Sequence, residues 1–155
     1  MAAIYVFALL IGVVAGLRAM TAPAAVSWAA RLGVLNLSGS WLAFLGNAWV
    51  PWVLLVAALG ELVTDQLPTT PSRKVPVQFG ARILTGAFSG AAIGVAADNW
   101  IVGALCGAVG AVAGTLGGAA ARGRLASAFG RDRPAAVIED LVAVGAAFLI
   151  AAGVS

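Results

Sequence analysis

The stretch WIVGALCGAVGAVAGTLGGAAA, residues 100–121, decides which class of fold the chain can adopt. It carries no charged residue, and glycine recurs along it at helical spacing. Roughly 20 apolar residues in a helix cross a hydrocarbon core of about 30 Å. The stretch therefore predicts a transmembrane helix that packs closely against another helix.

The overall composition extends this prediction to the whole chain. Of its 155 residues, 62% are hydrophobic and only 10% are charged, and the mean hydropathy is +1.03. Soluble domains carry about 25% charged residues. A soluble fold of this size has too much surface for its volume to bury so many apolar side chains. We expect one integral membrane domain over residues 1–155, with about five or six membrane segments.

Residues 52–59 and 142–154 argue against a transmembrane β-barrel. Barrel strands alternate apolar and polar residues, whereas these two runs are apolar without alternation. The abundant glycine and alanine suit close packing of helices. We therefore predict an all-α fold, a polytopic transmembrane helix bundle.

Apolar runs separated by prolines and charges place the individual helices. We expect membrane segments at residues 3–15, 24–35, 49–66, 78–97, 100–121 and 134–154. The polar interruption at 16–23 ends in proline, which disfavours helix in the residue before it. This leaves open whether residues 3–35 form one kinked helix or two short ones. Between the later segments we expect a three-proline loop at 67–76, a tight turn at 98–99 and a basic loop at 122–133.

Basic residues in two of these loops predict the orientation in the membrane. Arg73 and Lys74 lie in one loop, and four arginines lie in the other. Two segments separate the loops, so both fall on the same side, which the positive-inside rule makes cytoplasmic. We expect a multi-pass protein of the bacterial cytoplasmic (inner) membrane with its C-terminus outside. The side of the N-terminus depends on whether residues 16–23 form a turn.

Small residues recur every four positions in several segments. On a helix, such residues form a groove that lets another backbone approach closely. Two series carry the spacing: Gly86, Gly90 and Gly94, and then Gly103 and Gly107 followed, after a step of three, by Gly110, Gly114 and Gly118. We expect most of them to pack helices within the chain, with a homo-oligomer contact as the alternative for one face.

A short internal resemblance indicates a possible repeat. Gly16-Leu-Arg-Ala-Met-Thr21 and Gly80-Ala-Arg-Ile-Leu-Thr85 share glycine, arginine and threonine at the same spacing. Duplication of this kind is common among membrane transporters.

Ionisable side chains inside membrane segments are costly, so each is a hypothesis for a functional site. Glu61 and Asp65 are four residues apart and share a helix face. The topology that the loop charges predict places these and the other polar side chains toward the cytoplasmic half of the membrane. The expected set for binding a substrate or an ion is Arg18, Thr21, Glu61, Asp65, Arg82, Thr85, Glu139 and Asp140.

Two interpretations of this cluster stay open. In the structural one, Arg18 and Arg82 neutralise carboxylates and fix the register of the helices, because breaking a buried ion pair is costly. In the functional one, two carboxylates in excess of the arginines bind a cation or relay protons. Alternatively, the arginines together with Thr21 and Thr85 hold an anion or a phosphate head group. We favour the structural interpretation for single residues and the functional one for the cluster.

The cysteine and histidine content narrows the chemistry. The chain has one cysteine, Cys106, and no histidine. A disulfide within the chain is therefore impossible, and zinc and haem sites lack their usual ligands. We expect no cofactor, and the sequence assigns no metal ligands. The arginines lie between apolar runs, so they indicate the orientation in the membrane. We expect no nucleic-acid partner.

Several of these motifs resemble a known family. Gly16-Leu-Arg18, Gly60-Glu-Leu-Val-Thr-Asp-Gln-Leu-Pro68, Gly80-Ala-Arg82, Pro134 and Ile138-Glu-Asp-Leu141 are similar to motifs of a bacterial membrane-protein family known as domain of unknown function 4126. The resemblance covers nearly the whole chain. It implies a multi-helix membrane fold and supplies no established activity. Gln66 stands where the family pattern often has lysine.

Three classes of function fit these observations. The first is a small channel or transporter for an ion or a small polar solute, which uses the cluster of carboxylates and arginines. The second binds or processes a lipid phosphate in the membrane. The third is a structural or assembly protein with no transport. The chain has no catalytic triad, phosphate-binding loop or dinucleotide fingerprint, so we assign no catalytic residue and do not favour an enzyme.

Overall fold

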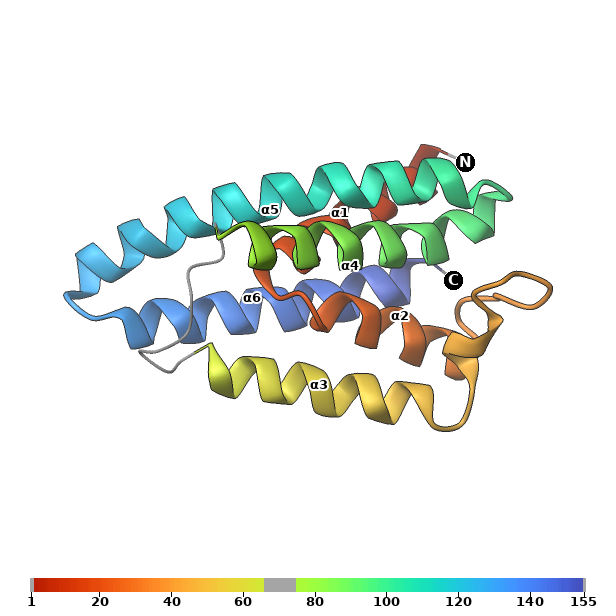
Figure 1. Ribbon diagram of the computed structural model, residues 1–155, viewed down its shortest axis with the longest axis horizontal. Coiled ribbons are helices and arrows are strands. Elements are labelled where there is room, and N and C mark those ends of the chain that lie inside the picture. Colours follow the sequence, from red (N-terminus) through yellow and green to blue (C-terminus); the bar gives the residue numbers. More distant parts are fainter. Residues whose placement is uncertain (1, 66–74, 155) are drawn as a thin grey trace.

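The computed structural model describes residues 2–65 and 75–154, and this part of the chain contains helices and no strand (Figure 1). The expected all-α fold is confirmed. The α-helices are α1 (Ala2–Leu17), α2 (Thr21–Arg31), α3 (Val50–Thr64), α4 (Pro76–Gly94), α5 (Trp100–Phe129) and α6 (Asp132–Gly153). Two short 3₁₀ helices are η1 (Ala43–Gly46) and η2 (Val95–Ala97).

Three of these helices are long and apolar enough to cross a membrane. They are α4 continued by η2, then α5, then α6, while α1 and α3 are shorter apolar helices. Successive helices run up and down the bundle, so both chain termini lie at one end (Figure 1). We call this end the terminal end. The opposite end, where α3 leads toward α4 and α5 turns into α6, is the basic end.

The first two membrane segments are separate helices. The backbone leaves α1 after Leu17 and enters α2 at Thr21, so the chain reverses over Arg18, Ala19 and Met20. This reversal lies inside the bundle, short of the turn between α5 and α6 (Figure 1). This answers the question that the sequence left open for residues 3–35. Helix α2 has only 11 residues. The reversal before it lies beside α3 and α4, whose side chains contact it.

Helix α5 lies directly against the backbones of α1 and α4. A Cβ atom added at Gly107 would lie 2.0 Å from the carbonyl oxygen of Gly86 on α4. One added at Gly12 would lie 2.1 Å from the carbonyl oxygen of Gly107, and one at Gly110 would lie 2.0 Å from that of Leu9 on α1. Side chains are therefore sterically impossible at these crossings, and glycine lets the three helices pack backbone to backbone.

The remaining glycines of the two series have the following positions. Gly90, Gly94 and Gly103 lie in the same α4–α5 crossing, and Gly114 lies against Val13 of α1. Gly118 is half-buried on α5. Since most of these faces are already occupied by helices of the same chain, a homo-oligomer would need another surface, and it stays a prediction.

Helix α5 is longer than the sequence indicated, and the expected basic loop at 122–133 is wrong. Only its end is a turn, where Gly130 adopts a left-handed φ of +66° and closes the helix. The preceding residues are mostly alanine, arginine and leucine, which favour helix. Arginines between apolar runs predict a loop, but charge alone does not end a helix. The tight turn at 98–99 is confirmed, with Asp98 at a φ of 55°.

The two segments of the possible repeat differ in local structure. Arg18 lies in the reversal between α1 and α2, whereas Arg82 lies inside the continuous helix α4. Gly16 is pressed against the backbone of α5, while a Cβ at Gly80 would meet nothing within 4 Å. The resemblance therefore does not extend to a shared local structure.

Helix α3 packs less closely than its neighbours. Only Pro51 and Ala58 are buried along it, and its contacts are chiefly with α2 and η1. Its outer face is apolar and exposed, as at Val53, Val56 and Val63. Such a face suits surrounding lipid.

We predict that Gly107→Ala destabilises the bundle by about 3 kcal/mol, because the added methyl group overpacks the α4–α5 crossing. The measurement is unfolding in mixed detergent micelles, followed by circular dichroism. Gly117→Ala is the control, since a Cβ there meets nothing within 4 Å and alanine favours helix by up to about 1 kcal/mol. Equal stability of the two variants would contradict backbone contact as the basis of the packing.

Candidate ligand site beside an ion-pair cluster

Arg18 is the centre of the polar cluster. Its side chain is fully buried, and its Nε donates a hydrogen bond of 2.6 Å to Oδ1 of Asp140 on α6. Its Nη1 pairs with Oδ2 of Asp65, the residue that follows α3. One guanidinium therefore joins the α1–α2 reversal to α3 and α6.

Glu61 caps the start of α2. Its Oε1 accepts a hydrogen bond of 2.8 Å from the amide of Ala19, and its Oε2 accepts one of 2.7 Å from the amide of Met20. The first amides of a helix have no partner within the helix, and a negative charge is favourable at that end. A carboxylate on α3 thus satisfies the backbone where α2 begins.

Arg82 donates to a backbone carbonyl at the end of α1. Its Nη1 donates a 2.9 Å hydrogen bond to the carbonyl oxygen of Gly16. Its Nη2 lies 3.8 Å from Oε1 of Glu61 and 3.7 Å from Oδ2 of Asp65. The last carbonyls of a helix lack partners and favour a positive charge. The reversal therefore has a guanidinium at the helix that ends and a carboxylate at the helix that begins.

Sequence analysis missed Arg122, which belongs to a second ionic group. Arg122 makes two hydrogen bonds with Asp132, of 3.0 and 2.7 Å, and its Nη1 lies 3.4 Å from Oε2 of Glu139. The view that an excess pair of carboxylates lacks a cationic partner was therefore wrong for Glu139. The residues after 121 favour helix, and this continuation of α5 could have indicated that Arg122 lies opposite α6.

The two threonines of the expected site have different surroundings. The hydroxyl of Thr85 donates to the carbonyl oxygen of Arg82 in its own helix, 3.1 Å away. Thr21 is buried, and its hydroxyl has no hydrogen-bond partner within the described part of the chain. The structure thus brings Arg18, Glu61, Asp65, Arg82 and Asp140 together and leaves Thr85 apart. Their role in binding a ligand stays a prediction.

A groove of about 540 Å³ begins beside Thr21. Helix α2 forms its floor, and α3 and α6 form its walls. Apart from Thr21, all its lining residues are alanine, valine, leucine, phenylalanine or tryptophan, with Trp28, Leu62 and Phe148 among the largest. It is an apolar trough in the face of the bundle on which α3 packs least closely.

The residues of the ion-pair cluster neighbour one end of this groove along three segments of the chain. Asp65 lies three residues after Leu62 on one wall, and Asp140 lies four residues before Val144 on the other. Residues at these spacings share a helix face. Arg18 precedes Thr21 by three residues and contacts both carboxylates. The ion pairs Asp65–Arg18–Asp140 therefore lie within about one helical turn of the groove along the chain, while none of these three residues lines it.

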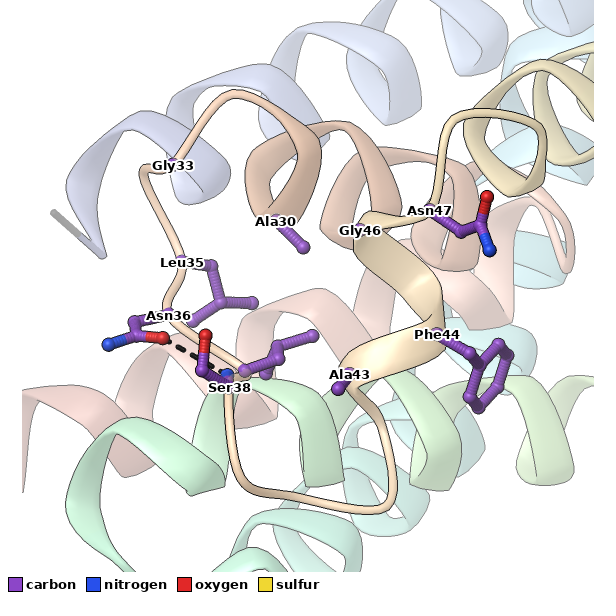
Figure 2. Close-up of a pocket in the computed structure, with 10 residues that line it drawn as sticks. Ala30, Gly33, Leu35, Asn36, Ser38, Ala43, Phe44, Gly46 and Asn47 are labelled. Carbon is purple, nitrogen blue, oxygen red and sulfur yellow. Dashed lines mark hydrogen bonds between the residues drawn. The ribbon is translucent and has the colours of Figure 1, made fainter.

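A different pocket of about 470 Å³ lies at the terminal end (Figure 2). The end of α2, the loop that follows it and η1 line this pocket. Leu35 and Leu37 are buried in the core beneath it. Within the loop, Asn36 accepts a 3.0 Å hydrogen bond from the amide of Ser38. This hydrogen bond joins residues two apart and closes the turn of the loop itself.

Comparison with known proteins identifies the family but no activity. A family described as Domain of unknown function (DUF4126) matches residues 6–152. The chain belongs to this family. No curated protein and no solved structure matches it. Since the match runs from α1 to α6, the whole bundle described above is the DUF4126 domain, including the cluster and the groove.

No metal site is found in this DUF4126 domain within residues 2–65 and 75–154. No group of three or more cysteine, aspartate or glutamate side chains in this part of the chain could hold a metal ion. The carboxylates at the reversal instead face arginines and backbone amides.

We predict that Arg18→Gln destabilises this DUF4126 protein by about 3 kcal/mol, because two carboxylates lose their shared buried cation. Thermal unfolding in detergent is the measurement. Arg31→Gln is the control, since Arg31 is exposed at the end of α2, where substitutions change stability by less than about 0.5 kcal/mol. The triple variant Arg18→Gln/Asp65→Asn/Asp140→Asn should recover part of the loss. If Arg18→Gln and Arg31→Gln unfold alike, the cluster does not hold the reversal.

Proposed function

We propose that this protein binds an amphiphile of the membrane, a molecule with an apolar chain and a polar end. Its site is the groove between α2, α3 and α6. The observation that carries the proposal is an apolar groove whose lining residues Thr21, Leu62 and Val144 lie within about one helical turn, along their own segments, of the ion pairs Asp65–Arg18–Asp140. A membrane lipid has the same division between its acyl chain and its head group.

The dimensions of the groove support this proposal. Its volume of about 540 Å³ lies within the range of about 300–1,000 Å³ that is usual for small-molecule sites. From Thr21 to Leu32 its floor extends about 16 Å along the chain at helical rise. The flanking side chains of Val56 on α3 and Phe148 on α6 are exposed. In a bilayer the groove would therefore open sideways to acyl chains.

The same observations favour an amphiphile over the ion or small polar solute that was the first expectation. An apolar lining offers no replacement for the hydration shell of an ion. The glycine crossings bring α5 into backbone contact with α1 and α4, so this part of the bundle offers no space for a solute. The arginines and carboxylates of the cluster largely satisfy one another and the backbone. A purely structural role for the cluster leaves the groove unexplained.

We further propose that the basic end faces the cytoplasm in a bacterial inner membrane. Arg124, Arg131 and Arg133 are exposed where α5 turns into α6, and the positive-inside rule favours the cytoplasmic side for them. Tryptophan pairs lie toward the terminal end, such as Trp28 and Trp52 with ring centroids 5.0 Å apart, and suit the opposite interface. Both termini are then outside, and the end of the groove beside Thr21 lies in the cytoplasmic half.

The proposal is tested with a variant whose side chain fills the groove. Ala151 is half-buried and lines it, so Ala151→Phe should occupy the space of the acyl chain. Native mass spectrometry of protein purified in mild detergent should show bound lipid on the wild type and at least tenfold less on this variant. Ala113→Phe is the matched control, because Ala113 is exposed on α5 outside the groove. Equal lipid occupancy of the two variants, with both folded, would refute the proposal.

A further inference from the structure

The turn between α5 and α6 carries the net charge of the chain. We call residues 122–133 the finger; they are the end of α5, the turn at Gly130 and the start of α6. The finger contains four arginines and one aspartate, a net charge of +3, and the whole chain also carries +3. The rest of the chain is therefore neutral. We propose that the finger binds the head groups of anionic phospholipids, at a surface separate from the groove.

The finger projects beyond helices α1 to α4 (Figure 1). Helix α4 runs opposite to α5, and Gly86, ten residues after the start of α4, lies against Ala111. The start of α4 is therefore level with about residue 121 of α5. Gly16, next to the last residue of α1, also lies against Ala111. Helix α5 continues to Phe129, about 12 Å past the start of α4.

The length of α5 places the finger at the membrane surface. The part of α5 without charge, residues 100–121, extends about 33 Å at helical rise and so covers a hydrocarbon core of about 30 Å. The head-group layer adds about 5–7 Å on each side of that core. Since the remaining part of α5 is about 12 Å long, the finger passes through this layer. We therefore expect its arginines to lie at and just beyond the level of the lipid phosphates.

Three arginines of the finger are available to an anion. The carboxylate of Asp132 is held by Arg122 through hydrogen bonds of 3.0 and 2.7 Å. The other arginines, Arg124, Arg131 and Arg133, are exposed, and none of them pairs with a carboxylate within the described part of the chain. Guanidinium groups donate paired hydrogen bonds to phosphate oxygens. An anionic lipid therefore supplies the opposite charge that these three side chains lack.

Phe129 favours a lipid over a soluble polyanion as the partner. Its side chain is 51% exposed at the end of α5, between Arg124 and Arg131 along the chain. Helices that bind the membrane surface combine basic residues with phenylalanine, tryptophan or leucine, whose side chains enter the boundary of the acyl chains. A phospholipid offers that apolar boundary to the ring and a phosphate to the arginines. A nucleic acid or an acidic protein segment offers only the negative charge.

The experiment compares two phospholipids with identical acyl chains. Phosphatidylglycerol is anionic and phosphatidylcholine is zwitterionic; each is titrated into the full-length protein in mild detergent, and bound lipid is counted by native mass spectrometry. One basic residue near an anionic lipid surface contributes a factor of about five. We therefore expect phosphatidylglycerol to bind at least about fivefold tighter. The triple variant Arg124→Gln/Arg131→Gln/Arg133→Gln should lose this preference with an unchanged unfolding temperature, because all three side chains are exposed.

Single variants locate the interaction. Arg131→Gln should weaken binding of phosphatidylglycerol about fivefold. Arg31→Gln is the matched control and should leave binding unchanged, because Arg31 is equally an exposed arginine but lies at the end of α2. Ala151→Phe should also keep the preference, because Ala151 lines the groove and lies outside the finger. Raising the ionic strength from about 0.1 to 1 M should reduce the preference of the wild type, since exposed charges are then screened.

The outcomes separate this inference from the proposed function. A preference that is lost in the triple variant and kept in Ala151→Phe supports the finger, even if the groove holds no lipid. Equal binding of the two lipids to the wild type, or a preference that survives in the triple variant, overturns the inference. If the preference is lost only in Ala151→Phe, the anion binds at the groove and the finger is the wrong site.

A soluble partner is tested with a short single-stranded RNA, added to the protein in phosphatidylcholine nanodiscs. If this RNA binds the wild type but not the triple variant, while the two lipids bind equally, the finger recognises a soluble polyanion and the assignment of lipid is wrong.

Discussion

The reversal between α1 and α2 imposes the constraint on which the rest of the structure depends. Wherever a helix ends and another begins inside a bundle, backbone carbonyls and amides lose their partners away from water. Here Arg82 supplies the donor and Glu61 the acceptors. These two side chains come from α4 and α3, so the reversal is complete only when both helices are docked. The charged residues that the sequence predicts as a functional site thus stabilise the junction between the two short helices α1 and α2.

Glycine packing makes these contacts reachable. Because α5 lies in backbone contact with α1, the end of α1 is held close enough to α4 for the guanidinium of Arg82 to reach Gly16. Thr115 of α5 also donates a hydrogen bond of 2.7 Å to Ala111 in its own helix and lies 3.4 Å from the same carbonyl of Gly16. Close packing on one side of the bundle thus leaves the opposite side, between α3 and α6, free to form the groove.

The sequence predicts the helical class, the glycine spacing and the convergence of charges, because each depends on local pattern and on lipid as solvent. It could not predict that Arg82 and Glu61 hold backbone groups, since those partners exist only once α1 and α2 are known to separate. The partners of Arg122 could not be predicted, because its charge indicates the end of the membrane segment whereas the helix α5 continues past it. The groove could not be predicted either, because it depends on the distance between α3 and α6 and not on any motif.

The partners of Arg18 lie 47 and 122 residues further along the chain. A ribosome delivers the chain from the N-terminus, so this arginine emerges long before α6 exists. Until then its charge has no complete set of partners within the bundle, and the α1–α2 hairpin should stay near the interfacial water. We therefore expect docking of α6 to be the closing step of biogenesis, because Asp140 completes the partners of Arg18 and lets its charge be buried.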